Sequence, residues 1–232
     1  MDSCADEVAL FRSNWSLYDA ITESNYMFHR EIYALVGQQL TASRPNGGAA
    51  ILDLGCGNTR FLAPYLRTAL PRRYVGVDLS ATALEEARGY LDGIPGVELQ
   101  LNDMLQTTQT LAERFDFIFS GFAVHHLAAA GKQALFSACA QRLAPGGRFL
   151  LVDVIRGEGE TRDECVDGYV EMMRSAWTDV PPELLEQACT HVAAHDFPEA
   201  LSELLRMGEN AGLRNCRLLE RFGQHAVIAF EG

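Results

Sequence analysis

The sequence predicts an α/β fold: a doubly wound, mostly parallel seven-stranded sheet with a reversed (antiparallel) last strand, plus a helical cap. Apolar runs of strand length alternate with helical patterns over residues 51–155, and short connections join them, which is typical of a parallel sheet. The runs are apolar almost throughout, as expected of strands covered by helices on both faces. Residues 217–221 and 225–230 form two further runs separated by a short turn, and strands joined so tightly must be antiparallel.

Local signals predict each element in order. We expect strands over residues 51–54, 74–78, 97–101, 115–120, 148–155, 217–221 and 225–230. Pro71 stops a first helix over residues 58–69, and Ser80 is a suitable N-cap for a second helix, whose inner face carries Ala83, Leu84, Ala87 and Leu91. Three more helices are expected over residues 107–114, 132–143 and 198–211, and residues 144–147 form a turn.

The glycine turn after the first strand is the main functional signal. Asp53 ends an apolar run that leads through Gly55 and Gly57 into a helical pattern, and strand, turn and helix start are the parts of a nucleotide-cofactor cradle. Arg60 stands where a dinucleotide-binding turn has its third glycine. A carboxylate just before the turn suits a cation better than two phosphates. Asp78 ends the second strand, where an acid can bind both hydroxyls of a ribose.

The sequence Asp-Leu-Gly-Cys-Gly at residues 53–57 resembles the first motif of class I S-adenosylmethionine-dependent methyltransferases of the small-molecule type. The resemblance covers residues 49–232 and implies S-adenosyl-L-methionine as cofactor, with the reversed last strand of that fold. It implies cofactor contacts from each strand end in turn. These candidate cofactor-binding residues are Asp53, Gly55, Cys56, Gly57, Asp78, Leu79, Asn102, Asp103, Met104, Gly121 and Phe122.

A histidine pair follows the fourth strand. His125 and His126 are the candidate catalytic residues, since an imidazole titrates near neutrality and one of them can act as a general base. The alternative is that they hold the loop through backbone hydrogen bonds. No metal is expected, because related magnesium-dependent enzymes have an Asp and an Asp-Asn pair where this chain has Ser120-Gly121 and Asp153-Val154. His191 and His195 lack the Glu of a zinc-protease helix.

Two segments lie outside the core formed by residues 46–156 and 198–232. Residues 1–45 are expected to form an N-terminal helical lid, and residues 157–197 a helical cap insertion. Helical spacing places Tyr26, Arg30 and Tyr33 on one face, with Tyr26 or Arg30 binding the cofactor. The candidate substrate residues are Tyr18, Tyr33, Asp153, Tyr169, Met173, Trp177 and His195. The alternative for the aromatic residues is packing in the core.

Composition limits the partners. A net charge of -12 without a basic cluster argues against nucleic acid, and no apolar run is long enough to cross a bilayer. The acidic N-terminus does not resemble a signal peptide, and the six cysteines lack Cys-x-x-Cys spacing, as expected of reduced thiols. We therefore expect a cytoplasmic protein, monomer or homodimer, that acts on a small-molecule methyl acceptor.

The predicted function is metal-independent methyl transfer to O, N or C of a small metabolite by in-line displacement. A protein or peptide methyltransferase is one alternative, since the negative charge would attract a basic partner. A non-catalytic S-adenosylmethionine-binding partner is another, although the full set of motif residues argues against a degenerate site. Arg60 and the reversed last strand disfavour a nicotinamide dehydrogenase.

Overall fold

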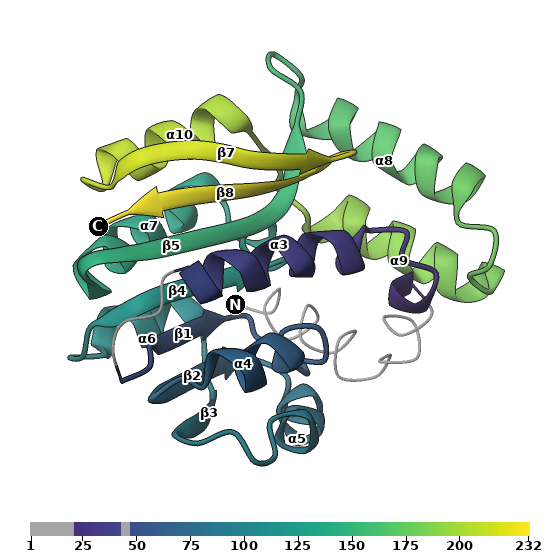
Figure 1. Ribbon diagram of the computed structural model, residues 1–232. Coiled ribbons are helices and arrows are strands. Elements are labelled where there is room, and N and C mark those ends of the chain that lie inside the picture. Colours follow the sequence, from purple (N-terminus) through teal and green to yellow (C-terminus); the bar gives the residue numbers. More distant parts are fainter. Residues whose placement is uncertain (1–20, 43–46) are drawn as a thin grey trace.

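The computed structural model describes residues 21–42 and 47–232. Its sheet has seven strands in the order β3-β2-β1-β4-β5-β8-β7, and the two-residue β6 pairs with β5 in addition (Figure 1). In chain order the strands are β1 (Ala50–Leu54), β2 (Arg73–Asp78), β3 (Val97–Leu101), β4 (Phe115–Gly121), β5 (Leu143–Arg156), β6 (Glu199–Ala200), β7 (Arg214–Phe222) and β8 (His225–Glu231). All pairs are parallel except those of β8 with β5 and β7, so the predicted reversed last strand is confirmed.

Helices cover both faces of this sheet. Those described are α3 (His29–Ala42), α4 (Ala63–Ala69), α5 (Ala81–Tyr90), α6 (Met104–Thr110), the 3-10 turn η1 (Val124–His126), α7 (Ala129–Arg142), α8 (Arg162–Ala176), α9 (Pro182–His195) and α10 (Leu201–Asn210). Side chains of α3, α4 and α5 pack on one face of the sheet. Those of α6, α7 and α10 pack on the other. Strands buried on both faces explain the continuous apolar runs of the sequence.

The cap helices α8 and α9 form a third core beyond the end of β5, together with Val154 of β5 and residues of the segment before α3 (Figure 1). Thr161 begins α8 with a capping box, in which its side chain and that of Glu164 bond each other's backbone amides. Tyr169 and Met173 of α8 and Trp177, which follows it, are buried in this third core. Part of the apolar surface of the insertion is thus buried within the insertion itself.

Several predicted helix boundaries are wrong by up to five residues. The first predicted helix begins at Ala63 and not at residue 58, because Thr59 has a left-handed backbone (φ 59°) and Pro64 occupies the first turn. The helix expected over 107–114 spans Met104–Thr110, because Asp103 caps it by accepting a hydrogen bond from the amide of Gln106. The helices expected over 132–143 and 198–211 span Ala129–Arg142 and Leu201–Asn210. The predicted cap at Ser80 is confirmed.

The turn expected at residues 144–147 lies within β5. Residues 144–147 bulge out of the ladder there. Phe115 pairs with Leu143 and Phe117 pairs with Arg148, so these four residues lie opposite the single residue between Phe115 and Phe117. Among the described helices, none is both long enough and apolar enough to cross a membrane.

Candidate active site

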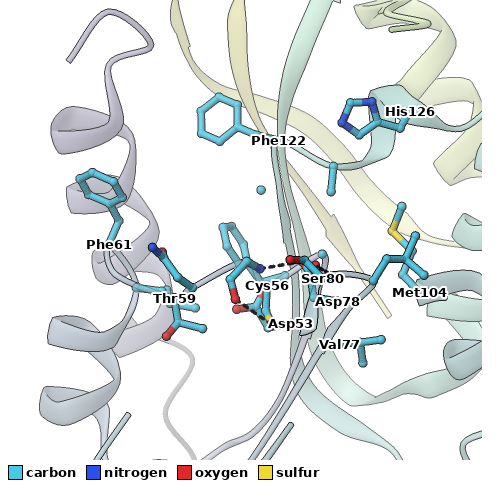
Figure 2. Close-up of a pocket in the computed structure, with 18 of the residues that line it drawn as sticks. Asp53, Cys56, Thr59, Phe61, Val77, Asp78, Ser80, Met104, Phe122 and His126 are labelled. Atoms are coloured by element: carbon cyan, nitrogen blue, oxygen red, sulfur yellow. Dashed lines mark hydrogen bonds between the residues drawn. The ribbon is translucent and has the colours of Figure 1, made fainter. Parts of the chain in front are cut away.

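A cavity of about 370 Å³ opens at the carboxyl ends of β1, β2 and β4 (Figure 2). The strand order reverses between β1 and β4, and ligands of open α/β sheets bind at such a point. The volume is within the range of cofactor pockets. The lining residues are Tyr33, Asp53, Gly55, Cys56, Gly57, Asn58, Thr59, Arg60, Phe61, Leu62, Val77, Asp78, Leu79, Ser80, Asn102, Asp103, Met104, Phe119, Gly121, Phe122, Ala123, His126, Leu127 and His191.

The glycine turn has a backbone that only glycine adopts easily. Gly55 and Gly57 have φ of 71° and 53°, and the amides of Gly55 and Cys56 both donate to the carbonyl of Val77, at 2.9 and 3.0 Å. A Cβ on Gly55 would lie 2.4 Å from the Cβ of Ala123, in the loop after β4. The two loops can therefore approach only because this side chain is absent.

Asp78 holds the turn from the end of β2. Its carboxylate accepts hydrogen bonds from the amides of Gly57 and Ser80, each at 2.8 Å. Burial raises the pKa of this carboxyl, whereas the bonds from Ser80 and Gly57 lower it. Asp78 thus fixes the glycine turn while its side chain remains on the cavity wall (Figure 2).

Asp53 is the more deeply buried carboxyl, with 2% of its surface exposed. Its Oδ2 accepts a 2.6 Å hydrogen bond from the hydroxyl of Tyr74, while Oδ1 has no hydrogen-bond partner among the described residues. Burial raises the pKa of Asp53 to about 7, with a smaller increase from Asp78, although the bond from Tyr74 lowers it. A cationic group in the cavity would compensate this carboxylate.

The loop after β3 forms another part of the wall. Asn102 accepts a hydrogen bond from the amide of Asp103 at 2.9 Å, and Asp103 accepts one from Gln106 at 2.7 Å as the cap of α6. Met104 is half-buried beside them. The helix cap therefore accounts for one oxygen of Asp103, and it is the structural reason for an acid at this position.

The two histidines have different surroundings. His125 is buried and absent from the cavity wall, and its Nδ1 bonds the carboxylate of Asp153. Burial lowers the pKa of His125, but Asp153 and Asp196 raise it more, to about 9. His126 lines the cavity (Figure 2). Of the two predicted catalytic residues, only His126 lines the cavity, whereas His125 is buried and bonded to Asp153.

Tyr26 and Arg30 were expected at the cofactor, but the structure places them elsewhere. The chain turns at residues 24–27, before α3 begins at His29, so Tyr26 does not share a helix face with Tyr33. Tyr26 stacks on Trp177 at 5.4 Å and exchanges hydrogen bonds with Asp179. Arg30 is exposed and donates to the carbonyl of Glu23. Tyr26 thus fastens the segment before α3 to the cap.

Of the candidate substrate residues, Tyr33 lines the cavity. Asp153 is buried against His125, and His195 borders a shallow depression on α9. The three apolar candidates on α8 and after it, Tyr169, Met173 and Trp177, pack into the third core instead, because α8 turns its apolar face toward α9. Tyr18 lies outside the described residues.

Some lining residues lack any signal in the sequence. Thr59 and Phe61 lie on the loop that was expected to be helical, so their approach to the cavity follows from the late start of α4. His191 reaches the wall from α9, far away in sequence. Only the fold brings His191 to this wall.

Comparison with known proteins agrees with this geometry. Residues 51–147 match the family model described as a methyltransferase domain. The chain is 33% identical over 129 residues to a ubiquinone biosynthesis O-methyltransferase of Chelativorans sp., covering 54% of this chain and 48% of that protein. It is 26% identical over 158 residues to the phosphoethanolamine N-methyltransferase of Plasmodium falciparum, covering 68% and 58%. The chain thus spans about half the length of these curated relatives.

The solved structure of DhpI in complex with SAH has the same fold, with a TM-score of 0.67 and 20% identity over 97% of this chain and 95% of that one. Three observations support the assignment of this chain to the class I S-adenosylmethionine-dependent methyltransferases. They are the sheet order, the cavity at the strand ends and the matched domain. The two curated relatives differ in their names: one is an O-methyltransferase of ubiquinone biosynthesis and the other is an N-methyltransferase of phosphoethanolamine.

Proposed function

We propose that this chain transfers a methyl group from S-adenosyl-L-methionine to O, N or C of a small-molecule metabolite, by in-line displacement and without a magnesium-type cation. The observation that carries the proposal is Asp53, a buried carboxyl whose Oδ1 has no hydrogen-bond partner in the described structure and which lines the cavity. A cofactor with an ammonium group and no phosphate suits this wall. The relatives named above support the same class of reaction.

The residues present fit such a cofactor. Gly55 and Gly57 let its amino-acid end approach the backbone, with Asp53 as the counter-charge. Asp78 would bind the ribose hydroxyls, and Asp103 and Met104 would flank the adenine. The cofactor supplies a methyl group already activated on a sulfonium, so the protein needs no nucleophile of its own.

The acceptor would enter from the side of His126. His126, Leu127 and His191 line the cavity, and Tyr33 and Phe122 add aromatic side chains to its wall. Because the methyl group is activated, the protein's task is to align the acceptor and exclude water. A pocket of this size and apolar character favours a small acceptor over a folded polymer.

Calorimetric titration of the full chain with S-adenosylmethionine, S-adenosylhomocysteine and NAD tests the cofactor directly. We expect micromolar binding of both adenosyl ligands and no heat from NAD. Binding of NAD alone would overturn the proposal. With the cofactor established, small phenols, carboxylic acids and amines can be screened for methylated products by mass spectrometry.

Asp78→Ala should weaken S-adenosylhomocysteine binding by one to two orders of magnitude. Hydrogen bonds to a charged group are each worth about 2 kcal/mol, and Asp78 also positions Gly57. Calorimetry measures the change in Kd. Asp92→Ala is the matched control, since Asp92 is an exposed acid away from the cavity and its removal should leave Kd unchanged. Equal affinity in both variants would contradict the ribose assignment.

His126→Gln should slow methyl transfer at least about 10-fold while S-adenosylhomocysteine affinity changes by less than about twofold, as expected of a residue that touches the acceptor. The measurement is kcat with whichever acceptor the screen identifies, together with a calorimetric Kd. A parallel loss of affinity would instead give His126 a role in shaping the cofactor end of the cavity.

A further inference from the structure

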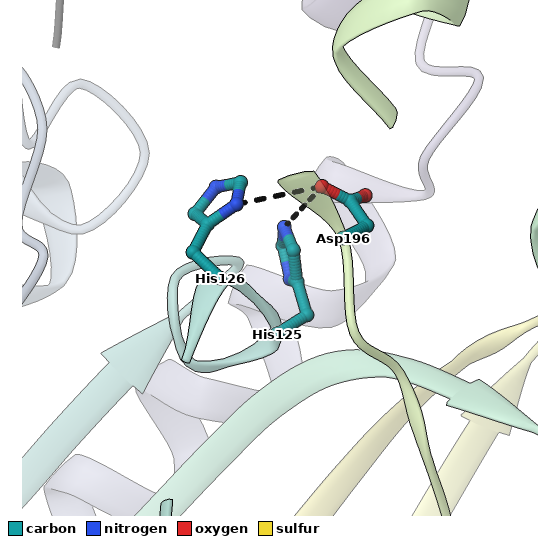
Figure 3. Close-up of side chains that lie close together, drawn as sticks. All are labelled: His125, His126 and Asp196. Atoms are coloured by element: carbon teal, nitrogen blue, oxygen red, sulfur yellow. Dashed lines mark ion pairs between the residues drawn. The ribbon is translucent and has the colours of Figure 1, made fainter. Parts of the chain in front are cut away.

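Three side chains meet where the cap joins the core. His125 and His126 come from η1, directly after β4, and Asp196 follows α9 (Figure 3). One potential ligand atom from each lies within 4.8 Å of the other two. Asp196 Oδ1 is 3.8 Å from Nε2 of His125 and 3.4 Å from Nδ1 of His126. His126 also lines the cavity of the proposed methyl transfer, whereas His125 and Asp196 do not.

These separations are too long for good hydrogen bonds but suit a shared ion. Two atoms that each lie ~2.1 Å from one metal ion at a tetrahedral angle are ~3.4 Å apart. Figure 3 shows the ion pairs from the two imidazoles converging on the same carboxylate oxygen. Each pair can therefore close on a single ion with small movements of the side chains.

Asp196 itself provides a second, independent observation. Only 6% of its surface is exposed, and its Oδ1 accepts no hydrogen bond from the described residues, although both histidines lie within ion-pair distance of it. A buried carboxylate oxygen without such a partner is costly unless a cation compensates it. In Figure 3 both histidine rings face this oxygen, so a cation that compensates it would lie between the three side chains.

The backbone around Asp196 is held in place from several sides. The amide of Phe197 donates to the carbonyl of His125 at 2.8 Å, and the guanidinium of Arg162 donates to the carbonyl of Asp196 at 2.9 Å. Lys132, which is buried, bonds the carbonyl of Phe197. The aspartate is thus preorganised by the core and by α8.

His125 also has the supporting contact that metal-binding histidines have. Its Nδ1 bonds the carboxylate of Asp153, which leaves Nε2 to face Asp196. Metal-ligating histidines usually donate their other ring N–H to a carboxylate or carbonyl, which fixes the tautomer and the ring orientation. Asp153 would play that part here.

We propose that His125 Nε2, His126 Nδ1 and an oxygen of Asp196 bind a borderline divalent transition-metal ion, with zinc as the best match, at the joint between core and cap. Two imidazoles and one carboxylate are a recurring zinc ligand set, with water in the fourth position. Magnesium is a poor match because it prefers oxygen ligands. With the carboxylate of Asp153 alongside, a divalent ion would neutralise the two buried carboxylates of the cluster.

The ion would connect the cap to the loop after β4. Asp196 belongs to the cap and His126 lines the cavity, so the ion would fix the cap over the acceptor end. The inference is separate from the proposed methyl transfer, which needs no Lewis acid. It differs from the expectation of a metal-free protein, which rested on the missing carboxylate cage after the fourth and fifth strands and on the missing Glu of a zinc-protease helix at His191 and His195.

The test is zinc titration of the full chain after treatment with a chelator, followed by calorimetry and elemental analysis. We expect about one zinc ion to bind per chain, and we expect magnesium to bind with much lower affinity. Substitution with cobalt(II) should give visible absorption bands typical of a low-coordinate nitrogen and oxygen site. Asp196→Asn and His125→Gln should each lower zinc affinity about 10-fold or more, because each removes a ligand atom.

Controls separate this site from others. His191 and His195 lie one helical turn apart on α9 and can bind zinc as a surface pair, so His195→Ala is the matched control. It should leave the stoichiometry unchanged. Circular dichroism and the Kd for S-adenosylhomocysteine verify that each variant is folded. No zinc binding in the folded wild type, or a loss of binding with His195→Ala alone, would overturn the inference and leave the proposed methyl transfer standing.

Discussion

Replacing Gly55 with alanine should lower the affinity for S-adenosylhomocysteine by about 100-fold or more and destabilise the fold by about 2–5 kcal/mol. Two effects add. The φ of 71° is unfavourable for a residue with a Cβ, and the new methyl group would lie 2.4 Å from the Cβ of Ala123. Neither partner can rotate away, since both are Cβ atoms fixed to backbone. The loops after β1 and β4 must separate, and both line the cavity.

Gly93→Ala isolates the contribution of the backbone. Gly93 has a φ of 78°, similar to that of Gly55, but a Cβ there would meet nothing within 4 Å. We expect it to cost about 1–2 kcal/mol from backbone strain alone, with no change in Kd. Chemical denaturation and calorimetry on both variants provide the comparison. If the two variants lost equal stability and neither lost affinity, close approach of the two loops would not be what the cofactor site requires.

The sequence predicts the sheet well because its signals are local. Continuous apolar runs predict strands buried on both faces, and the tight turn at residues 222–224 predicts the antiparallel pair of β7 and β8. The motif from Asp53 to Gly57 and the acid Asp78 lie at strand ends, where the topology brings them to one cavity. The glycine motif and the acids at strand ends are thus sufficient to predict which residues line this cavity.

The acceptor end could not be predicted in the same way. Tyr169, Met173 and Trp177 have the composition of a pocket wall, but the pairing of α8 with α9 decides where they point, and that pairing depends on contacts distant in sequence. The arrangement of His125, His126 and Asp196 has the same origin, because 70 positions separate His126 from Asp196 and only the fold brings them together. Residue types alone therefore indicated polar groups without indicating their partners.

Asp53→Asn should stabilise the ligand-free protein at neutral pH. The pKa of Asp53 is raised from 3.8 to about 7 by burial, so the folded state holds a proton that the unfolded state has lost over that range. Stability from this group is therefore fully present below pH 3.8 and is lost as pH rises through about 7. At a pH above the folded-state pKa of about 7, the free energy of unfolding is lower by about 4 kcal/mol than it would be if the pKa had not shifted.

Asparagine retains an oxygen that can accept the bond from Tyr74 and carries no charge, so the variant should lack this pH dependence. Urea unfolding from about pH 5 to about pH 8 measures it, and the advantage of the variant over wild type should grow across that window. Tyr74→Phe is the companion change, since it removes the one hydrogen bond that favours the charged form and should increase the loss at high pH. Parallel stability curves for wild type and Asp53→Asn would show that Asp53 is ionised at no cost.

The same carboxyl links stability to ligand binding, on the basis of the proposed function. An ammonium group placed beside Oδ1 favours the carboxylate, so binding of S-adenosylhomocysteine at about pH 6 should release close to one proton from wild type and none from Asp53→Asn. Calorimetry in two buffers of different ionisation enthalpy measures that number. A charge that is unfavourable in the empty cavity then becomes favourable once the ligand is bound. Asp53 would thus lower the stability of the ligand-free protein and raise its selectivity for a cationic ligand, and equal proton counts in both proteins would refute that link.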